Sequence, residues 1–528
     1  MGTQPAENRS GVQRMGRGRL KSDSCGKRIP GQVKMVKVYI LPAKKEIEVE
    51  ENTTILRAEQ LAGIRQDTPC GGYGICRKCK VLADGREVLA CRTAIRKNMT
   101  VTVLSDISAT RVLTDSSQTD IRVNPVREGN IHASVDLGTT TVVCYLMDGK
   151  DGHILDVESM LNPQFPYGAD VISRTQAALR DDAMDALIRL VREGIWDLVR
   201  KCCLKTGRKP EEIGTFTLVG NPTMQQLFMG VSPENLARPP FQPVLTKPEV
   251  HRLSEFFPVE SEGVFLVIPD VAGYVGADTM GCILSSGMYK EDSITLLVDI
   301  GTNGEMVLGN REKMVACSTA AGPALEGGRI SCGMRAASGA VDHVWLESGE
   351  IRCSVIDHVE PKGFCGSGLI DAVAVMLNLD ALNRRGRIIK NYELSGEERI
   401  FAFSGSAVLT QKDIREVQMA KGAIAAGITL LIKQMGITEK DIGRVILCGA
   451  FGSYMNPESA ARIGLIPEIL LPKVIQAGNA AGAGSRMIAL NQDIFRETGT
   501  LLKGIQEIEL ASLPEFQRAF ASQMMFDR

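Results

Sequence analysis

The chain changes from an aperiodic to an alternating pattern at Met35, where "MVKVYILPAKKEIEVE" begins. Apolar and polar residues alternate at 36–41 and 46–50 with a proline between the two runs, which predicts a β-hairpin. A helical segment follows, and "MTVTVL" at 99–104 predicts a closing strand. Together these elements predict a small β-grasp domain over residues 35–107.

The segments on either side of this domain carry no such pattern. Residues 1–34 are polar and basic, so we expect a disordered leader, and Met1, Met15 and Met35 all stay open as translation starts. Residues 108–130 are polar without a helical period, which predicts a linker.

After the linker, one strand–turn–strand pattern occurs twice. "IHASVDLGTTTVVCYL" opens at 131 and "SITLLVDIGTNGEMVL" opens at 293, which indicates an internal repeat. Apolar strands alternate with helical stretches in between, which is typical of α/β architecture. We therefore expect one α/β unit over 131–528 with two subdomains, approximately 131–290 and 291–528. The expected strands lie at 215–220, 264–270 and 444–452, and the expected helices at 182–203, 365–378 and 411–435.

Composition narrows the class of protein. The chain has 61 lysines and arginines and 62 aspartates and glutamates. The basic excess that is typical of nucleic-acid-binding proteins is therefore absent from the composition. No run of about 18 apolar residues predicts a membrane span, and the leader lacks the apolar core of a secretion signal. We expect a cytoplasmic protein.

Four of the 14 cysteines lie close together, in the spacing C-x5-C-x2-C-x11-C: Cys70, Cys76, Cys79 and Cys91. Four thiolates on a glycine-rich loop suit a 2Fe-2S cluster. A structural zinc ion stays open as an alternative, although zinc sites usually combine two C-x2-C pairs and only one is present here. The segment resembles adrenodoxin-like 2Fe-2S ferredoxins, whose fourth cysteine generally lies further downstream. We expect the other ten cysteines to be buried small apolar residues.

Each repeated turn combines an aspartate with glycines and hydroxyl groups. Backbone amides and hydroxyls there can face phosphate oxygens, while the carboxylate holds Mg²⁺ through its water ligands. Two such turns across a cleft would bind the phosphates of one nucleotide from both sides. The residues are Asp136, Gly138, Thr139 and Thr140 in the first turn, and Asp299, Gly301, Thr302, Asn303 and Gly304 in the second.

A third element, "RVILCGAFG", is an apolar strand that ends in Gly449, Ala450, Phe451 and Gly452, where a nucleoside could lie against the backbone. The chain contains no G-x4-G-K-[ST] phosphate loop. The three elements in this order resemble the superfamily of acetate and sugar kinases, Hsp70 and actin. That resemblance implies ATP binding and a duplicated ribonuclease-H-like fold. Glu326 either faces the terminal phosphate or caps a turn.

The cysteine loop together with "VDLGTTT", "VGNPTM", "AGPALEGG", "CGSGLID" and "GAFGSY" resembles the reductive activators of corrinoid proteins. The resemblance implies an ATP-dependent, one-electron reduction of a Co(II) corrinoid protein to Co(I), an external low-potential electron donor, and a homodimer. The reduction potential of a plant-type two-iron cluster is about −400 mV, and that of the Co(II)/Co(I) couple is lower still. Electron transfer from the cluster to the corrinoid is therefore unfavourable by itself. Some relatives carry further four-iron clusters at the carboxyl end; no cysteine follows Cys448 in this sequence, so we expect none of these clusters here.

Two other functions stay open. The first is a small-molecule kinase with an accessory redox-sensing ferredoxin domain, for which no general base is assigned. The second is a binding protein whose association responds to ATP and to the cluster. The identities of the corrinoid protein, methyl donor and electron donor also stay open, as does the choice between ATP binding and ATP hydrolysis as the driving step.

Overall fold

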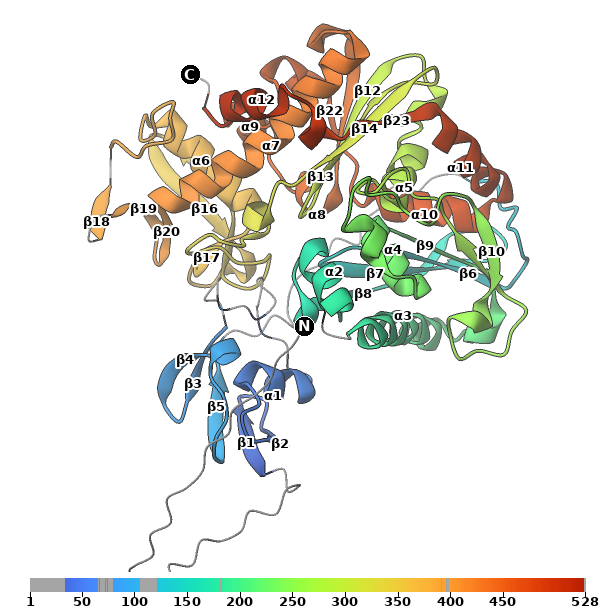
Figure 1. Cartoon of the computed structure of the whole chain (residues 1–528). Coiled ribbons are helices and arrows are strands. Elements are labelled where there is room, and N and C mark those ends of the chain that lie inside the picture. Colours follow the sequence, from blue (N-terminus) through green and yellow to red (C-terminus); the bar gives the residue numbers. More distant parts are fainter. Residues whose placement is uncertain are drawn as a thin grey trace, which may run out of the picture.

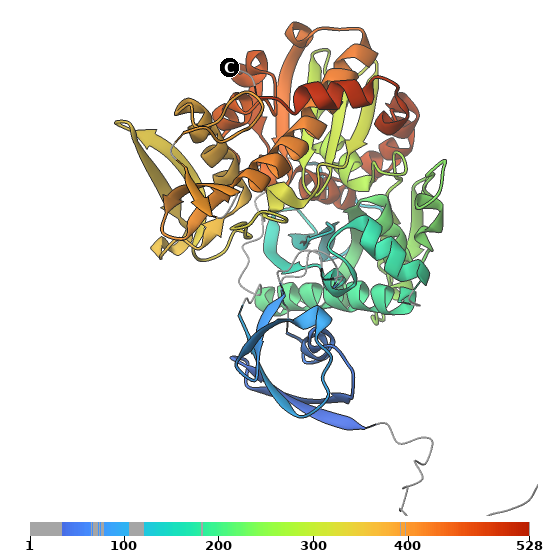
Figure 2. The ribbon, with the colours of Figure 1, turned by 60° about the vertical axis from the view of Figure 1, so that its left-hand side comes forward.

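The computed structural model describes residues 34–64, 66, 72, 74, 79–104, 121–180, 183–390, 392–395 and 398–526, without the side chains of 395, 450 and 451. Residues 1–33 of the predicted leader lie outside this part. Figure 1 shows the whole chain. Figure 2 shows that the amino-terminal sheet forms a separate body beside two larger sheets.

The amino-terminal sheet is mixed, with strand order β2-β1-β5-β3-β4, and only β1 and β5 run parallel. Alternation along β1 buries Val36, Val38 and Ile40 while the residues between them are exposed. Thr54 caps the helix by accepting a hydrogen bond from the Arg57 amide. This arrangement confirms the β-grasp prediction. The elements are β1 Met35–Leu41, β2 Lys45–Glu50, α1 Ile55–Leu61, β3 Lys80–Ala83, β4 Arg86–Leu89 and β5 Met99–Val103.

Two six-stranded sheets follow one common plan. In each, the first strand of the predicted repeat (β6 or β12) pairs antiparallel with the next strand and parallel with a later one (β9 or β21). The predicted duplicated ribonuclease-H-like fold is therefore confirmed. The first sheet runs β10 (Glu249–Arg252), β11 (Val264–Val267), β9 (Ile213–Gly220), β6 (Ile131–Leu137), β7 (Thr141–Asp148) and β8 (Ile154–Leu161). The second runs β22 (Val474–Gln476), β21 (Ile442–Cys448), β12 (Ile294–Ile300), β13 (Gly304–Gly309), β14 (Met314–Thr319) and β23 (Ile505–Glu507).

Helices and two small sheets surround this framework. The longest helix, α7, begins and ends where the sequence predicts, because Thr410 and Asp413 form a capping box and Gly436 ends it. Within the described residues, no helix is long and apolar enough to cross a membrane. The helices are α2 Val171–Arg180, α3 Met184–Thr206, α4 Pro222–Met229, α5 Ala277–Ser286, α6 Gly366–Asn378, α7 Gln411–Met435, α8 Gly449–Gly452, α9 Pro457–Arg462, α10 Ala480–Leu490, α11 Gln492–Gly504 and α12 Phe516–Gln523. The small sheets comprise β15 (Ala340–Glu347), β16 (Glu350–Val355) and β17 (Gly363–Phe364), and β18 (Glu393–Ser395), β19 (Glu398–Ser404) and β20 (Ala407–Thr410).

The two halves meet where α5 packs against α10, between the six-stranded sheets (Figure 1). The helices approach through glycines: a Cβ on Gly484 would lie 2.0 Å from the Gly281 carbonyl oxygen. A Cβ on Gly281 would lie 2.8 Å from the Ala481 carbonyl oxygen. Only glycine permits this approach, so the crossing fixes how close the halves come.

The described end of the predicted linker, residues 121–130, is attached to the second repeat. Ile121 and Val123 pack against buried Leu490. The Asn124 amide donates to the Leu490 carbonyl at 2.8 Å. The alternating apolar residues in this segment explain why it is anchored here, and the earlier part of the predicted linker lies outside the described residues.

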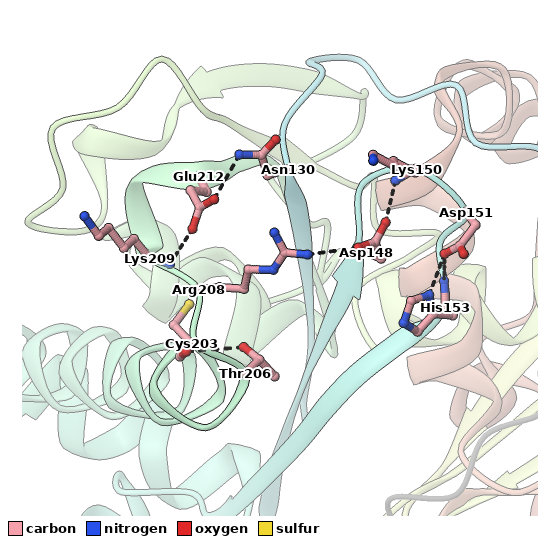
Figure 3. A network of polar contacts seen from close by, with 10 residues as sticks. All are labelled: Asn130, Asp148, Lys150, Asp151, His153, Cys203, Thr206, Arg208, Lys209 and Glu212. Atoms are coloured by element: carbon pink, nitrogen blue, oxygen red, sulfur yellow. Dashed lines mark hydrogen bonds and ion pairs between the residues drawn. The ribbon is translucent and has the colours of Figure 1, made fainter.

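A polar network lies beside β6 and β7 at one end of the first six-stranded sheet (Figure 3). The Asn130 side chain donates to Glu212 at 2.9 Å, and Glu212 also accepts from the Lys209 amide at 2.6 Å. Arg208 donates to the Asp148 carboxylate at 3.2 Å. These contacts join the end of the linker to the loop after α3 and to the β7–β8 turn.

We expect Gly484→Ala to lower the free energy of unfolding by roughly 1–3 kcal/mol, because the added methyl group displaces the α5 backbone. Gly504→Ala is the matched control, since a methyl group added there, on α11, would meet nothing within 4 Å. Chemical denaturation of both variants checks this. Equal stability of the two would show that the helix crossing is not tight.

Candidate functional site

Two of the four predicted cluster ligands meet in the amino-terminal domain. Cys79 and Cys91 are buried, and their sulfur atoms lie 3.2 Å apart. Cys91 therefore lies beside the loop despite its short distance in sequence from the other cysteines. Cys70 and Cys76 lie outside the described residues.

The described glycines of the loop fit a tightly wrapped metal-binding segment. Gly72 and Gly74 have φ values of +88° and +74°, which side chains rarely adopt. A Cβ on Gly74 would lie 2.2 Å from Nε of Arg92, the residue after Cys91. The loop thus lies against the segment that carries the fourth cysteine, as a shared ligand set requires, so the residues present fit a 2Fe-2S cluster.

Both repeated turns open onto one cavity of about 340 Å³. Each turn is closed by one backbone hydrogen bond of 2.9 Å, from Gly138 to Thr141 and from Gly301 to Asn303. The cavity is therefore bounded from both halves of the duplicated fold. Its lining includes the predicted residues Asp136, Gly138, Thr139, Thr140, Asp299, Gly301, Thr302, Asn303 and Gly449.

The segment from Gly449 to Gly452 forms a helical turn, α8, instead of extending the strand. Gly449 has φ +82°, and a Cβ there would lie 2.2 Å from Oδ1 of Asp299. Gly452 and Gly304 are not among the cavity-lining residues, and a Cβ on Gly304 would meet Thr319 at 3.0 Å. The side chains of Ala450 and Phe451 lie outside the described part of the chain.

Four carboxylates gather at the end of the cavity that the two turns bound. Burial raises the pKa of Asp136 to about 7 and that of Asp299 to about 6. Burial also raises the pKa of Asp278 to about 7, and raises that of Glu305 well above its usual range. All four line the cavity. Loss of hydration disfavours their ionised forms, so a cation is the natural complement of this end.

Sequence reasoning did not assign Asp278 or Glu305. Asp278 lies in the first turn of α5, where an acidic residue is common for reasons of helix stability alone. Glu305 lies in β13 and becomes recognisable only because strand pairing places it opposite Asp299.

Two helix-capping asparagines support the first turn. Asn221 caps α4 and donates to the Thr139 hydroxyl at 3.0 Å. Asn479 caps α10 and donates to the Asp136 carboxylate at 2.8 Å. Each asparagine precedes a helix directly, a signal visible in "GNPTM" and "GNAAGAG" but equally expected of ordinary caps.

Glu326 connects the two turns. Its carboxylate accepts hydrogen bonds from the Thr140 hydroxyl at 3.0 Å and from the Thr302 hydroxyl at 2.6 Å. One side chain therefore spans both halves of the cavity.

Two arginines bring positive charge to the same region. Arg174 is fully buried and donates to the Thr139 carbonyl and, at 2.9 Å, to the Gly168 carbonyl. Arg335 lines the cavity with its guanidinium 4.8 Å from the centre of the Phe165 ring. Its buried Nη1 has no hydrogen-bond partner within the described residues, which leaves a donor available for an anion.

His343 lines another part of the cavity and is paired with a carboxylate behind it. His343 Nδ1 lies 3.0 Å from Oδ2 of buried Asp371, and this hydrogen bond raises the pKa of His343. Oδ1 of Asp371 is buried without a partner among the described residues. The two residues lie on β15 and α6, so only the tertiary fold brings them together.

Three family models match successive parts of the chain. Residues 38–97 match the family described as a 2Fe-2S iron-sulfur cluster binding domain. Residues 132–291 match the "RACo middle region", and residues 293–528 match the "C-terminal domain of RACo the ASKHA domain". The chain belongs to the family of reductive activators of corrinoid proteins.

Among these activators, the chain is similar to a solved structure titled "Reductive activator for corrinoid, iron-sulfur protein". That similarity has 27% identity, a TM-score of 0.70, and coverage of 93% of this chain and 98% of that one. The "Corrinoid activation enzyme RamQ" of Eubacterium limosum is 29% identical over 92% of this chain and 98% of its own length. A "[Co(II) methylated amine-specific corrinoid protein] reductase" of Methanosarcina barkeri is 26% identical over 70% and 72%.

We expect Asp136→Asn to stabilise the metal-free protein at neutral and higher pH. Folding raises the pKa of the Asp136 carboxyl from about 4 to about 7, so its proton is bound more tightly in the folded protein. The resulting stabilisation is complete below about pH 4 and is lost as the pH rises to about 7. The variant's gain should therefore grow across that window, to the order of 2–4 kcal/mol. Thermal unfolding of both proteins at about pH 5 and about pH 8 checks this.

Added Mg²⁺ is the control. A bound cation lowers the cost of ionising Asp136 in the wild type, so it should reduce the difference in stability between the variant and the wild type. If the variant and the wild type had the same stability at both pH values, the pKa of Asp136 would not be raised by folding.

Proposed function

We propose that this activator reduces the corrinoid of a methyltransferase-system protein from Co(II) to Co(I) with one electron, in a step that depends on ATP. The observation that carries the proposal is one chain that combines the paired cysteines of a 2Fe-2S domain with two repeated Asp–Gly–Thr turns around one cavity. The corrinoid-activating relatives support it over the kinase and binding-protein alternatives.

We propose that Asp136 and Asp299 hold Mg²⁺ and that the two turns bind the phosphates of ATP. Loss of hydration raises the pKa of all four carboxylates, so a cation beside them would favour their ionised forms, and Mg²⁺ prefers oxygen ligands and phosphates. The Arg335 guanidinium and the Thr139 hydroxyl, which accepts from Asn221 and keeps its own proton, supply donors for the phosphate oxygens. Among the predicted nucleotide residues, Gly449 positions Asp299 by leaving room for its carboxylate.

We propose that Cys70, Cys76, Cys79 and Cys91 hold the cluster. When bound, a 2Fe-2S cluster supplies one electron at a time at low potential. The thiolates would bind it, with Cys79 and Cys91 buried, while Gly72 and Gly74 let the loop backbone approach.

Further parts of the proposal concern organisation. We propose a ferredoxin domain at 35–107, a linker at 108–130 and an ATPase domain at 131–528. The corrinoid protein and an external low-potential donor are the expected partners. We also propose a homodimer and a cytoplasmic location, in line with the family resemblance.

We expect Asp299→Ala to lower ATP-dependent Co(I) formation by at least about a hundredfold, because Mg²⁺ loses a ligand at the phosphate end. Its cluster spectrum should stay unchanged. Cys91→Ser should show the reverse pattern: loss of the cluster spectrum with retained nucleotide affinity. The measurement is anaerobic mixing of each reduced protein with a Co(II) corrinoid protein and ATP, following Co(I) absorption. Normal Co(I) formation by Asp299→Ala would refute the assigned role.

We also propose that Glu326 acts on the terminal phosphate step, since its carboxylate lies between the hydroxyls of both turns. We expect Glu326→Gln to slow ATP hydrolysis by roughly 10²–10⁴-fold, because the amide cannot accept a proton from water. Nucleotide affinity should change much less, since the amide keeps a hydrogen-bonding oxygen. Phosphate release and equilibrium nucleotide binding separate the two effects, and unchanged hydrolysis would exclude this role.

A further inference from the structure

Two buried thiols lie directly behind Asp299, although they are far apart in the sequence. Cys282 lies on α5, and Cys448 is the last residue of β21. The two sulfur atoms are 3.9 Å apart, and the Cys282 sulfur is 3.5 Å from Oδ2 of Asp299. The three ligand atoms all lie within 4.8 Å of one another. Two of the ten cysteines expected to be ordinary apolar residues therefore form a group with a carboxylate.

The two distances from the Cys282 sulfur match those in a tetrahedral metal site, and the third lies within 4.8 Å. For zinc with Zn–S of about 2.3 Å and Zn–O of about 2.0 Å, tetrahedral ligand atoms lie about 3.8 Å (S to S) and about 3.5 Å (S to O) apart. The corresponding distances here are 3.9 Å and 3.5 Å. Asp299 lines the cavity, so the fourth corner can face the cavity and its water.

The surroundings favour a cation at this position. Asp136, Asp278 and Glu305 line the same end of the cavity, and each is a carboxylate removed from bulk water. Thiolates select soft cations such as Zn²⁺ and Cd²⁺, whereas Mg²⁺ is held by oxygen ligands alone. One carboxylate therefore belongs to two donor sets that suit different metals.

We propose that Cys282, Asp299 and Cys448 form a site for a soft divalent cation, Zn²⁺ or Cd²⁺, whose binding withdraws Asp299 from Mg²⁺ and thereby weakens nucleotide binding. Binding replaces the two thiol protons, which pass to solvent, with two metal–sulfur bonds and involves no change of oxidation state. The inhibitory part rests on the proposed role of Asp299 in binding Mg²⁺. The metal site itself rests on the three ligand positions alone.

The test uses the full chain with its cluster in place, so that the cluster cysteines are occupied. After anaerobic exposure to Cd²⁺ and desalting, we expect the wild type to retain one more Cd²⁺ per chain than Cys282→Ser or Cys448→Ser. The extra ion should give an ultraviolet thiolate–cadmium absorption in the difference spectrum. Comparison with single variants also subtracts metal bound by the exposed group of Asp148, Asp151 and His153.

Cys202→Ser is the matched control, since Cys202 and Cys144 form another buried thiol contact but belong to no comparable three-ligand group in the described part of the chain. It should bind Cd²⁺ like the wild type. An intact cluster spectrum and normal nucleotide affinity in Mg²⁺ alone establish that each serine variant is folded.

The second measurement is nucleotide affinity in Mg²⁺, with and without saturating Cd²⁺. We expect Cd²⁺ to weaken nucleotide binding by at least about tenfold in the wild type and in Cys202→Ser, and by less than about twofold in Cys282→Ser. Equal Cd²⁺ uptake by wild type and Cys282→Ser would overturn the site. Uptake without loss of affinity would overturn the inhibition. Absence of nucleotide binding in Mg²⁺ alone would instead count against the proposed function, and Cd²⁺ uptake would still test the site.

Discussion

The site depends on a concentration of carboxylates at the edge where the two halves of the fold meet. Asp136, Asp278, Asp299 and Glu305 all lie where burial raises their pKa values. Loss of hydration makes the ionised form of these carboxylates costly, so this edge stays protonated or takes up a cation. Nucleotide phosphates alone would add to the repulsion, whereas a metal–nucleotide complex brings the cation with it. The same charge explains why a neighbouring pair of thiols could complete a site for a softer ion.

The position of this charge follows from the duplicated topology. In each half a later strand runs parallel to the first strand of the hairpin, so their carboxyl ends reach the same edge. The helices capped by Asn221 and Asn479 also begin at this edge. The glycine contact between α5 and α10 then sets the separation of the halves. Regular elements therefore position the two turns that bound the cavity.

Local pattern was sufficient for the features that depend on neighbouring residues. Alternation located the hairpin of the first domain, capping and periodicity located α7, and the repeated aspartate turns located both halves of the cavity. Glu305 and the pair of His343 and Asp371 depend on strand pairing and helix packing, for which sequence spacing contains no signal. The segment of residues 121–130 has polar composition overall, which concealed two apolar residues that anchor it.

The contacts of Glu326 suggest how a nucleotide acts on more than its own site. Each half contributes one hydroxyl to this carboxylate, so a change in their separation alters both hydrogen bonds. A terminal phosphate brings further negative charge toward the same hydroxyls, and ADP, lacking that group, cannot do so. ATP and ADP must then differ in how strongly they favour approach of the two halves, and such differential affinity is the only means by which a ligand shifts a conformational equilibrium. Closure about the α5–α10 contact would then couple the binding of ATP to a partner bound outside the cavity. An electron transfer that is uphill in isolation requires a coupling of this kind.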